Sequence, residues 1–336
     1  MDKAPGINIR IIYEKLPVAG TGLKALGLSE QIERTLLYVQ SLGKGLFTVA
    51  APTEHGKSTT LTIWLGDLMS SRQNRLTVVS VDDPPEGLDP RFLYFPINDG
   101  NGEGEDSHTA AIKASLRVAP HVVRISECRE GPSARMAFDV GNTGKLACTT
   151  IHCSGVLNIP SRYEELGVSR VLAYNAERHC AWYSQRLVPQ LCQKCRKPIT
   201  AAAADDPRFD VLHGRFRAAI GPEADGLHVR GAGCVACSGG RTRSAPGIKG
   251  RRLLAEILLP TRHVCALLEA GNYDGARRHW LADQKGRSMT LDGYDLLLSG
   301  TIGAEEWVSF VSSAEDLALD LEYAAIRTAP VPRAVA

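Results

Sequence analysis

The chain has 336 residues, of which 44% are hydrophobic, so its length suits about two domains and it has ample material for a buried core. Its 39 basic and 37 acidic side chains give a formal net charge of +2. This near balance gives no reason to expect a polyanionic partner, which weakens a nucleic-acid-binding role without excluding it.

The sequence contains no run of about 18 or more apolar residues, so it predicts no membrane-spanning helix. The first ten residues lack the apolar core and the cleavage site of a secretion signal, and we expect a cytoplasmic protein. Nine cysteines, an odd number, then favour metal binding or burial over disulfides.

Residues 1–44 predict the remnant of an N-terminal α+β domain. The segment from Ile7 to Ile11 alternates apolar and polar residues, as in a half-buried strand. Residues 23–39 carry apolar residues at helical spacing, with Ser29 as a candidate N-cap and Gly43 as the stop.

Residues 45–190 predict an α/β core. We expect strands at 46–50, 76–81, 121–126 and 146–150, and helices at 57–70, 108–118 and 132–140. The segment 84–106 is rich in Pro, Gly, Asp and Asn and predicts a long loop. Strands that alternate with helices favour a parallel sheet covered on both faces.

The character of the sequence changes after about residue 190. Residues 191–252 are loop-rich, contain two cysteine pairs and leave room for a helical insertion at 203–222. Residues 253–327 predict a helical C-terminal domain, with helices at 261–270, 274–284, 302–312 and 313–327. Residues 328–336 predict a disordered tail.

Residues 51–58 have the spacing of a P-loop and lie between a predicted strand and a predicted helix. Backbone N–H groups at a helix N-terminus bind phosphate oxygens, Lys57 would reach the β- and γ-phosphates, and Ser58 would ligate Mg²⁺. The predicted nucleotide-binding residues are Ala51, Pro52, Thr53, Glu54, His55, Gly56, Lys57, Ser58 and Thr59. The alternative is a chance strand–Gly-Lys-Ser–helix match, and a carboxylate at Glu54 would repel phosphate unless it points away or pairs with a cation.

A P-loop site also needs acidic partners for Mg²⁺ and for the attacking water. Asp82 and Glu86 follow one predicted strand, Glu127 follows the next, and His152 follows the one after that, where it could contact the γ-phosphate. The alternatives are turn chemistry before Pro84 for the aspartate, a solvated strand end for the glutamate at 127, and a structural histidine.

Cys192 and Cys195 form one CxxC pair, and Cys234 and Cys237 form a second. Two such pairs complete a closed tetrahedral zinc site, which leaves no position for water and is therefore structural. A redox pair is the alternative, but it needs only one CxxC. The remaining cysteines are interpreted as core or neutral positions.

In order and spacing, these motifs resemble the secretion ATPases of type II secretion and type IV pilus assembly. The resemblance runs from about residue 5 to 312. It rests on the P-loop at 51–59, an aspartate box at 80–86, a Walker B region at 121–130, a histidine box at 143–152, the run Gln185-Arg186-Leu187, and the cysteine pairs. It implies a RecA-like P-loop NTPase core with a tetracysteine zinc module and a small helical C-terminal domain.

The resemblance implies a hexameric ATPase that uses ATP, Mg²⁺ and a structural Zn²⁺, and that couples hydrolysis to assembly of pilin-like subunits. Its partners would be further copies of the chain and an inner-membrane platform protein, so the protein would sit peripherally at the inner membrane. The implied catalytic residues are Glu127, Asp82, Glu86, Arg129 and His152. In ring ATPases an arginine from a neighbouring subunit stabilises the γ-phosphate, and Arg117, Arg129 and Arg186 are candidates.

Two alternatives remain open, and the departures from the family pattern favour the first of them. Ala51 and Glu54 replace glycines of the P-loop, Asp82 stands where the family usually has Glu, and Arg124 interrupts a strand expected to be apolar. A nucleotide-binding but weakly hydrolysing or inactive regulatory paralogue is one alternative. A conjugation or DNA-transfer ATPase is the other, and the near-neutral charge argues against it.

Overall fold

The computed structural model describes residues 22–82, 89–96, 107–125, 127–238 and 245–326. The strand expected at Ile7–Ile11, the candidate catalytic residue Glu86, most of the loop 84–106 and the tail 328–336 lie outside the described residues.

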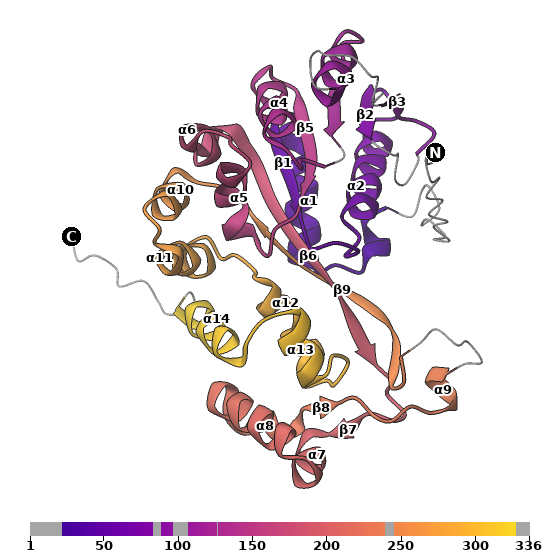
Figure 1. The fold of residues 1–336 in the computed structure, drawn as a ribbon, viewed down its shortest axis with the longest axis vertical. Helices are drawn as coiled ribbons and strands as arrows, with labels where there is room; N and C mark the ends of the chain where they lie inside the picture. The colour runs from indigo at the N-terminus through magenta and orange to yellow at the C-terminus, as the bar shows by residue number, and fades with distance from the viewer. Residues whose placement is uncertain (1–21, 83–88, 97–106, 126, 239–244, 327–336) are drawn as a thin grey trace, which may run out of the picture.

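A seven-stranded sheet forms the centre of the molecule, in the order β3-β2-β4-β5-β1-β6-β9 (Figure 1). The strands are β1 (Gly45–Ala50), β2 (Val78–Asp82), β3 (Leu93–Pro96), β4 (Val122–Ile125), β5 (Leu146–Ile151), β6 (His179–Leu191) and β9 (Ile248–Leu258). Neighbouring strands from β3 to β6 run parallel, and β9 pairs antiparallel with β6. The expected parallel sheet is therefore confirmed, with one antiparallel strand at its edge.

Helices cover both faces of this sheet because its central strands are buried on both sides. On one face, α1 (Glu30–Leu42) and α2 (Lys57–Ser71) pack their apolar side chains against Phe47 and Val49 of β1. On the other, α3 (Ser107–Leu116), α4 (Gly131–Asn142) and α5 (Ile159–Glu165) pack in one cluster with Leu46 and Ala50. The period-two alternation of β1 thus divides its side chains between the two layers.

The remaining elements lie mostly after residue 155. The helices are α6 (Arg170–Ala173), α7 (Ile199–Asp205), α8 (Pro207–Ile220), α9 (Val235–Ser238), α10 (Arg262–Glu269), α11 (Tyr273–Arg278), α12 (Met289–Leu298), α13 (Ala304–Phe310) and α14 (Ala314–Ile326). Short helical turns are η1 (Leu23–Leu26), η2 (Val156–Asn158), η3 (Ala176–Arg178), η4 (Gly221–Gly226) and η5 (His279–Asp283), and β7 (Lys197–Pro198) pairs with β8 (His228–Val229).

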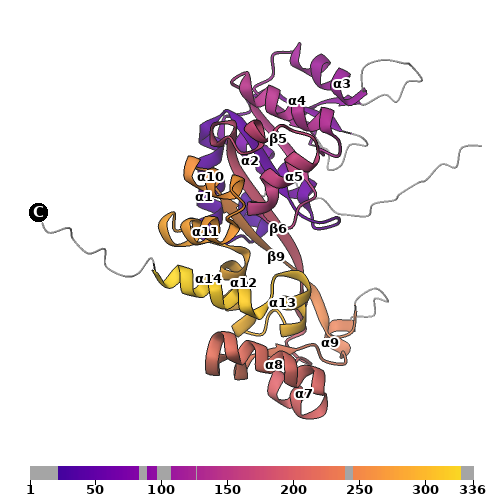
Figure 2. The same cartoon turned by 60° about the vertical axis from the view of Figure 1, so that its left-hand side comes forward.

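The ribbon of β6 and β9 connects the sheet to the C-terminal half of the molecule. β6 has 13 residues, and its segment beyond Ser184 continues past β1 while it stays paired with β9 (Figures 1 and 2). Around the far end, α7, α8 and α12–α14 share a third hydrophobic cluster that includes Phe216 and Trp307. The domain boundary expected between residues 252 and 253 falls inside β9.

Several sequence expectations differ from the structure in this half. The helix expected at 274–284 is α11 followed by the π-helical turn η5, and α12 was not expected. β6 was also not expected, because buried polar residues such as Ser184 and Gln185 interrupt its apolar residues and obscure the hydrophobic pattern of the strand. Among the described residues, no helix is long and apolar enough to cross a bilayer.

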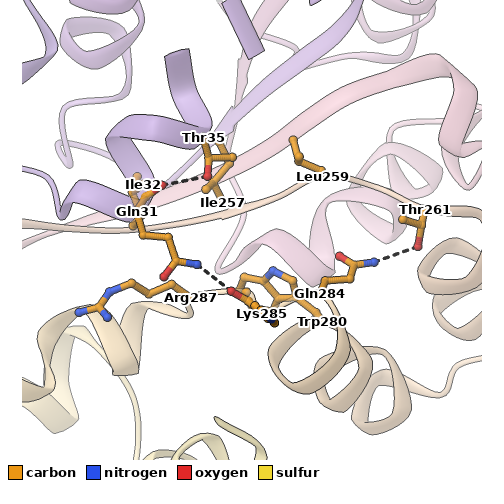
Figure 3. A pocket seen from close by; sticks show the side chains of 11 residues that line it. Gln31, Ile32, Thr35, Ile257, Leu259, Thr261, Trp280, Gln284, Lys285 and Arg287 are labelled. Atoms are coloured by element: carbon orange, nitrogen blue, oxygen red, sulfur yellow. Dashed lines mark hydrogen bonds between the residues drawn. The ribbon is translucent and has the colours of Figure 1, made fainter. Parts of the chain in front are cut away.

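A cavity of about 290 Å³ lies between helix α1 and the C-terminal half of the molecule. Figure 3 shows Ile32, Ile257 and Trp280 around it. Among the residues that line it, Gln31 Nε2 donates to the carbonyl of Lys285 at 2.7 Å. This contact ties α1 to the turn after η5, so α1 packs on the C-terminal half as well as on the sheet.

Candidate functional site: a phosphate loop at the carboxyl edge of the sheet

The P-loop connects β1 to α2 at the carboxyl ends of the parallel strands, as the sequence predicts. Gly56 has φ 78° and ψ 21°, a left-handed conformation that favours glycine and directs the chain into α2. Glu54 is also left-handed, with φ 65°, although it has a side chain, and it is exposed. The loss of glycine at position 54 therefore leaves the turn in place but adds backbone strain.

The His55 side chain anchors the loop to β6. Its Nδ1 accepts the backbone N–H of Leu187 at 2.9 Å, and its carbonyl accepts from Gln185 Nε2 at 2.5 Å. The ring lies 6.3 Å from that of Phe310 in α13. Burial, followed by the positive charges of Arg186 and Lys57, lowers the pKa of His55, so its neutral, accepting form is favoured. His55 thus has a structural role in the loop.

Lys57 is buried and held by three acceptors. Its Nζ donates to the carbonyls of Ala51 at 2.9 Å and Pro52 at 3.1 Å, and contacts His152 Nδ1 at 3.2 Å. A lysine ammonium only donates, so Nδ1 accepts and Nε2 carries the histidine hydrogen. Burial and the charge of Lys57 lower the pKa of His152, which favours this neutral form.

Glu127 lies on the other side of His152. Its Oε1 is 2.5 Å from His152 Nε2, and its Oε2 accepts from Arg129 Nε at 2.8 Å. The side chain of Glu127 is largely buried, whereas that of Arg129 is 70% exposed. Three expected site residues from two strand ends and the P-loop helix are therefore brought into one chain of contacts: Glu127, His152 and Lys57.

Asp82 ends β2 at the same edge of the sheet but has different neighbours. Its Oδ2 accepts from Ser80 Oγ at 2.7 Å, and its Oδ1 lies 3.9 Å from Arg124 Nε. The carboxylate and the guanidinium are both fully buried. Ser58 and Thr59 lie half-buried in the first turn of α2.

Two contacts of this site were not anticipated from the sequence. Arg124 Nη1 donates to Thr62 Oγ1 in α2 at 3.0 Å. Glu256 of β9 accepts the N–H groups of Val156, at 2.9 Å, and Met289, at 3.1 Å, so it joins the loop after His152 to α12. A charged residue inside an apolar strand is the sequence signal that marks Arg124.

The four cysteines of the two CxxC pairs come together at the far end of the β6–β9 ribbon. Their sulfur atoms all lie within 4.8 Å of one another, with separations of 3.7 Å for Cys192–Cys234 and 3.9 Å for Cys195–Cys237. A tetrahedral zinc ion with Zn–S bonds of about 2.3 Å requires sulfur atoms about 3.8 Å apart, so the set fits zinc. All four thiols are free of disulfides.

The backbone around the sulfur cluster is closely packed. The N–H of Cys192 donates to the carbonyl of Gly247 at 2.7 Å, and the N–H of Cys234 donates to Cys237 Sγ at 3.1 Å. A Cβ on Gly231 would lie 1.6 Å from the carbonyl oxygen of Cys195. Only glycine fits there, and this close contact of the two backbones holds the two cysteine pairs near each other.

Comparisons with known proteins agree with these observations. A family model described as "Type II/IV secretion system protein" matches residues 3–309. Type II secretion system protein E of Dickeya dadantii is 28% identical over 286 residues, which cover 85% of this chain and 52% of that protein. Type II secretion system ATPase E of Vibrio cholerae is 29% identical over 270 residues, or 78% of this chain and 47% of that protein.

A solved structure shows the same fold. The crystal structure of the pilus retraction motor PilT with bound ADP has a TM-score of 0.56 and 20% identity, and the match covers 88% of this chain and 68% of that one. The chain spans about half the length of the curated relatives it matches. The resemblance recognised from the motifs is confirmed, and the chain belongs to the type II/IV secretion system protein family.

Proposed function

We propose that the chain is an ATPase that binds Mg·ATP at the P-loop and hydrolyses it. The observation that carries this proposal is the chain of contacts from Glu127 through His152 to Lys57 at the carboxyl edge of the sheet. A carboxylate, a neutral imidazole and an ammonium group at one helix N-terminus supply the base, the sensor and the phosphate ligand of phosphoryl transfer.

Each residue has a distinct role in this proposal. Lys57 exchanges the carbonyls of Ala51 and Pro52 for the β- and γ-phosphate oxygens, and Ser58 ligates Mg²⁺. Glu127 orients the attacking water and accepts its proton. His152, whose Nε2 lies 2.5 Å from Glu127 Oε1, reports the presence of the γ-phosphate by changing its contact with Lys57. Arg129, whose side chain is 70% exposed, acts with a neighbouring subunit.

The larger function proposed is that of a homo-hexameric motor for pilin-like subunits. Support comes from the relatives, which include a type II secretion system protein E and a type II secretion system ATPase E, and from the likeness of fold to a pilus retraction motor. In this proposal ATP hydrolysis in the ring drives assembly and extrusion of pilin-like subunits through an inner-membrane platform protein, and the chain works at the cytoplasmic face of that membrane.

A second candidate is a regulatory member of such a ring that binds nucleotide and hydrolyses it weakly. The observation that favours it is the double engagement of Glu127, whose two carboxylate oxygens lie 2.5 Å from His152 and 2.8 Å from Arg129. A carboxylate held on both sides is less free to turn toward the attacking water. The rate of turnover separates the two candidates.

We further propose that the four cysteines hold one structural Zn²⁺. The ion would stabilise the loop-rich segment around β7, β8 and α9, which also packs on the third hydrophobic cluster and is tied to α13 by the Arg230–Glu306 ion pair.

The test of the ATPase proposal is phosphate release by the zinc-loaded oligomer with and without Mg²⁺. Mass photometry of the same samples gives the number of subunits. We expect Mg²⁺-dependent release from a ring of six, and background release from Lys57→Ala. Magnesium-dependent release that survives in Lys57→Ala would show that the P-loop is not the site.

A further inference from the structure

Arg124 is a charged residue in the middle of the buried sheet. It lies on β4, pairs in register with Ser80 of β2 and Cys148 of β5, and has no exposed surface. A guanidinium cannot lose its charge at ordinary pH, so a buried arginine needs a counter-charge and hydrogen-bond acceptors. Its neighbours therefore define its role.

Those neighbours are a strand end and the P-loop helix. Asp82, at the end of β2, provides the counter-charge at 3.9 Å, and Ser80 Oγ fixes the other carboxylate oxygen at 2.7 Å. Thr62 Oγ1 accepts from Arg124 at 3.0 Å and donates to the carbonyl of Ser58 at 2.8 Å. One continuous set of contacts thus runs from Asp82 to the first turn of α2.

The two candidate acidic residues at this edge differ in what they can reach. Glu127 has 14% of its side chain exposed and contacts His152, which contacts Lys57. The side chain of Asp82 has no exposed surface and faces Arg124 and Ser80. A carboxylate that acts on the attacking water must meet that water, and this condition favours Glu127.

We propose that Arg124 is a positioning residue that holds the P-loop helix through Thr62, and that Asp82 is its counter-ion and does not act on the attacking water. This inference rests on the ATPase function proposed above. It assigns Asp82 a different role from the catalytic one that the family resemblance implies.

The test is a double-mutant cycle with Asp82→Asn, Arg124→Met and the double variant, beside Glu127→Gln. Each single variant leaves one buried polar group without its partner, so we expect melting roughly 5–10 °C below wild type. The double variant should recover at least half of that loss. Its turnover number should stay within a few-fold of wild type, whereas that of Glu127→Gln falls to background.

The positioning role is tested separately by Thr62→Val, which removes the acceptor of the Arg124 contact, with Thr62→Ser as the conservative control. We expect Thr62→Val to raise the KM for Mg·ATP about fivefold or more, with a smaller change in kcat, and Thr62→Ser to restore it. A purely structural contact would lower the melting temperature and leave the KM unchanged.

Two results would overturn the inference. One is additive losses of stability in the double variant, which would show that Asp82 and Arg124 are not coupled. The other is a double variant that melts as a folded protein but, at saturating Mg·ATP, is as inactive as Glu127→Gln, which would make Asp82 a catalytic residue. If wild type itself shows no turnover, the ATPase proposal fails. The positioning role of Arg124 is then still tested by the melting temperatures and by the affinity of the variants for a fluorescent ATP analogue.

Discussion

His152 joins Glu127 to Lys57, with its Nε2 2.5 Å from the glutamate oxygen and its Nδ1 3.2 Å from the lysine ammonium. The two residues at either end come from different parts of the fold, the end of β4 and the start of α2. The imidazole therefore connects the proposed base for water activation with the proposed phosphate ligand.

We expect the removal of the Glu54 carboxylate from the P-loop to increase the affinity for Mg·ATP. Glu54→Gly replaces an exposed carboxylate at φ 65° with the residue that this conformation favours. If the carboxylate repels the phosphates by ~1 kcal/mol, the Kd for Mg·ATP falls about fivefold. Isothermal titration calorimetry measures this change.

Glu54→Gln separates charge from strain at this position. It removes the carboxylate and keeps a side chain in the left-handed backbone, so we expect it to share the gain in affinity. Only Glu54→Gly, which relieves the backbone strain, should also melt at a higher temperature than wild type. Unchanged affinity in both variants would show that the carboxylate does not face the nucleotide.

Loss of the His55 side chain should weaken the binding of Mg·ATP. His55→Ala removes the acceptor of the Leu187 N–H and frees the loop from β6, so the Kd for Mg·ATP should rise about fivefold to tenfold, equivalent to ~1–1.5 kcal/mol. Phe310→Leu, which leaves that hydrogen bond intact, is the matched control and should change the Kd less. Equal affinity of His55→Ala and wild type would exclude an anchoring role.

The cysteine cluster predicts one tightly bound zinc per chain. Elemental analysis should give a ratio near one for wild type and near zero for Cys195→Ser, and the variant should melt several degrees lower because the metal stabilises the fold. Gly231→Ala should also lower the zinc content, since its Cβ would overlap the Cys195 carbonyl, whereas Gly226→Ala, where a Cβ meets open space, should not. Full zinc loading of Cys195→Ser would place the metal elsewhere.

His179 predicts a loss of stability in mild acid. The residue is buried between Phe138 and Trp182, and burial lowers its pKa to about 4. In the unfolded chain His179 binds a proton near pH 6.5, whereas in the folded chain it stays neutral until the pH approaches 4. The free energy of unfolding therefore has its full value above pH 6.5 and falls as the pH drops toward 4. The expected loss over this window is about 3 kcal/mol.

Urea unfolding at several pH values measures this loss, with His179→Gln as the control. The glutamine does not titrate, so the variant should lose less stability between pH 6.5 and 4 than wild type does. Parallel pH profiles for the two proteins would contradict a buried neutral His179.

The sequence predicted most of the α/β core because strands such as β1 are largely apolar runs. The P-loop motif also identified Lys57 as the first residue of α2. It did not predict β6, whose buried polar residues Ser184 and Gln185 obscure the hydrophobic pattern. The edge positions of Glu127 and His152 followed from the parallel order of the strands. Their contacts, and the pairing of Asp82 with Arg124, depend on side-chain geometry that spacing does not specify.

The most direct test of the central claim compares Mg·ATP binding and turnover in wild type and Glu127→Gln, both zinc-loaded and assembled. We expect the variant to bind Mg·ATP as tightly as wild type and to hydrolyse it at least about a hundredfold more slowly, since the water loses its base while the phosphate ligands stay in place. Equal turnover in the two proteins would contradict the role of Glu127, and an inert wild-type ring would contradict the motor function and leave the regulatory role.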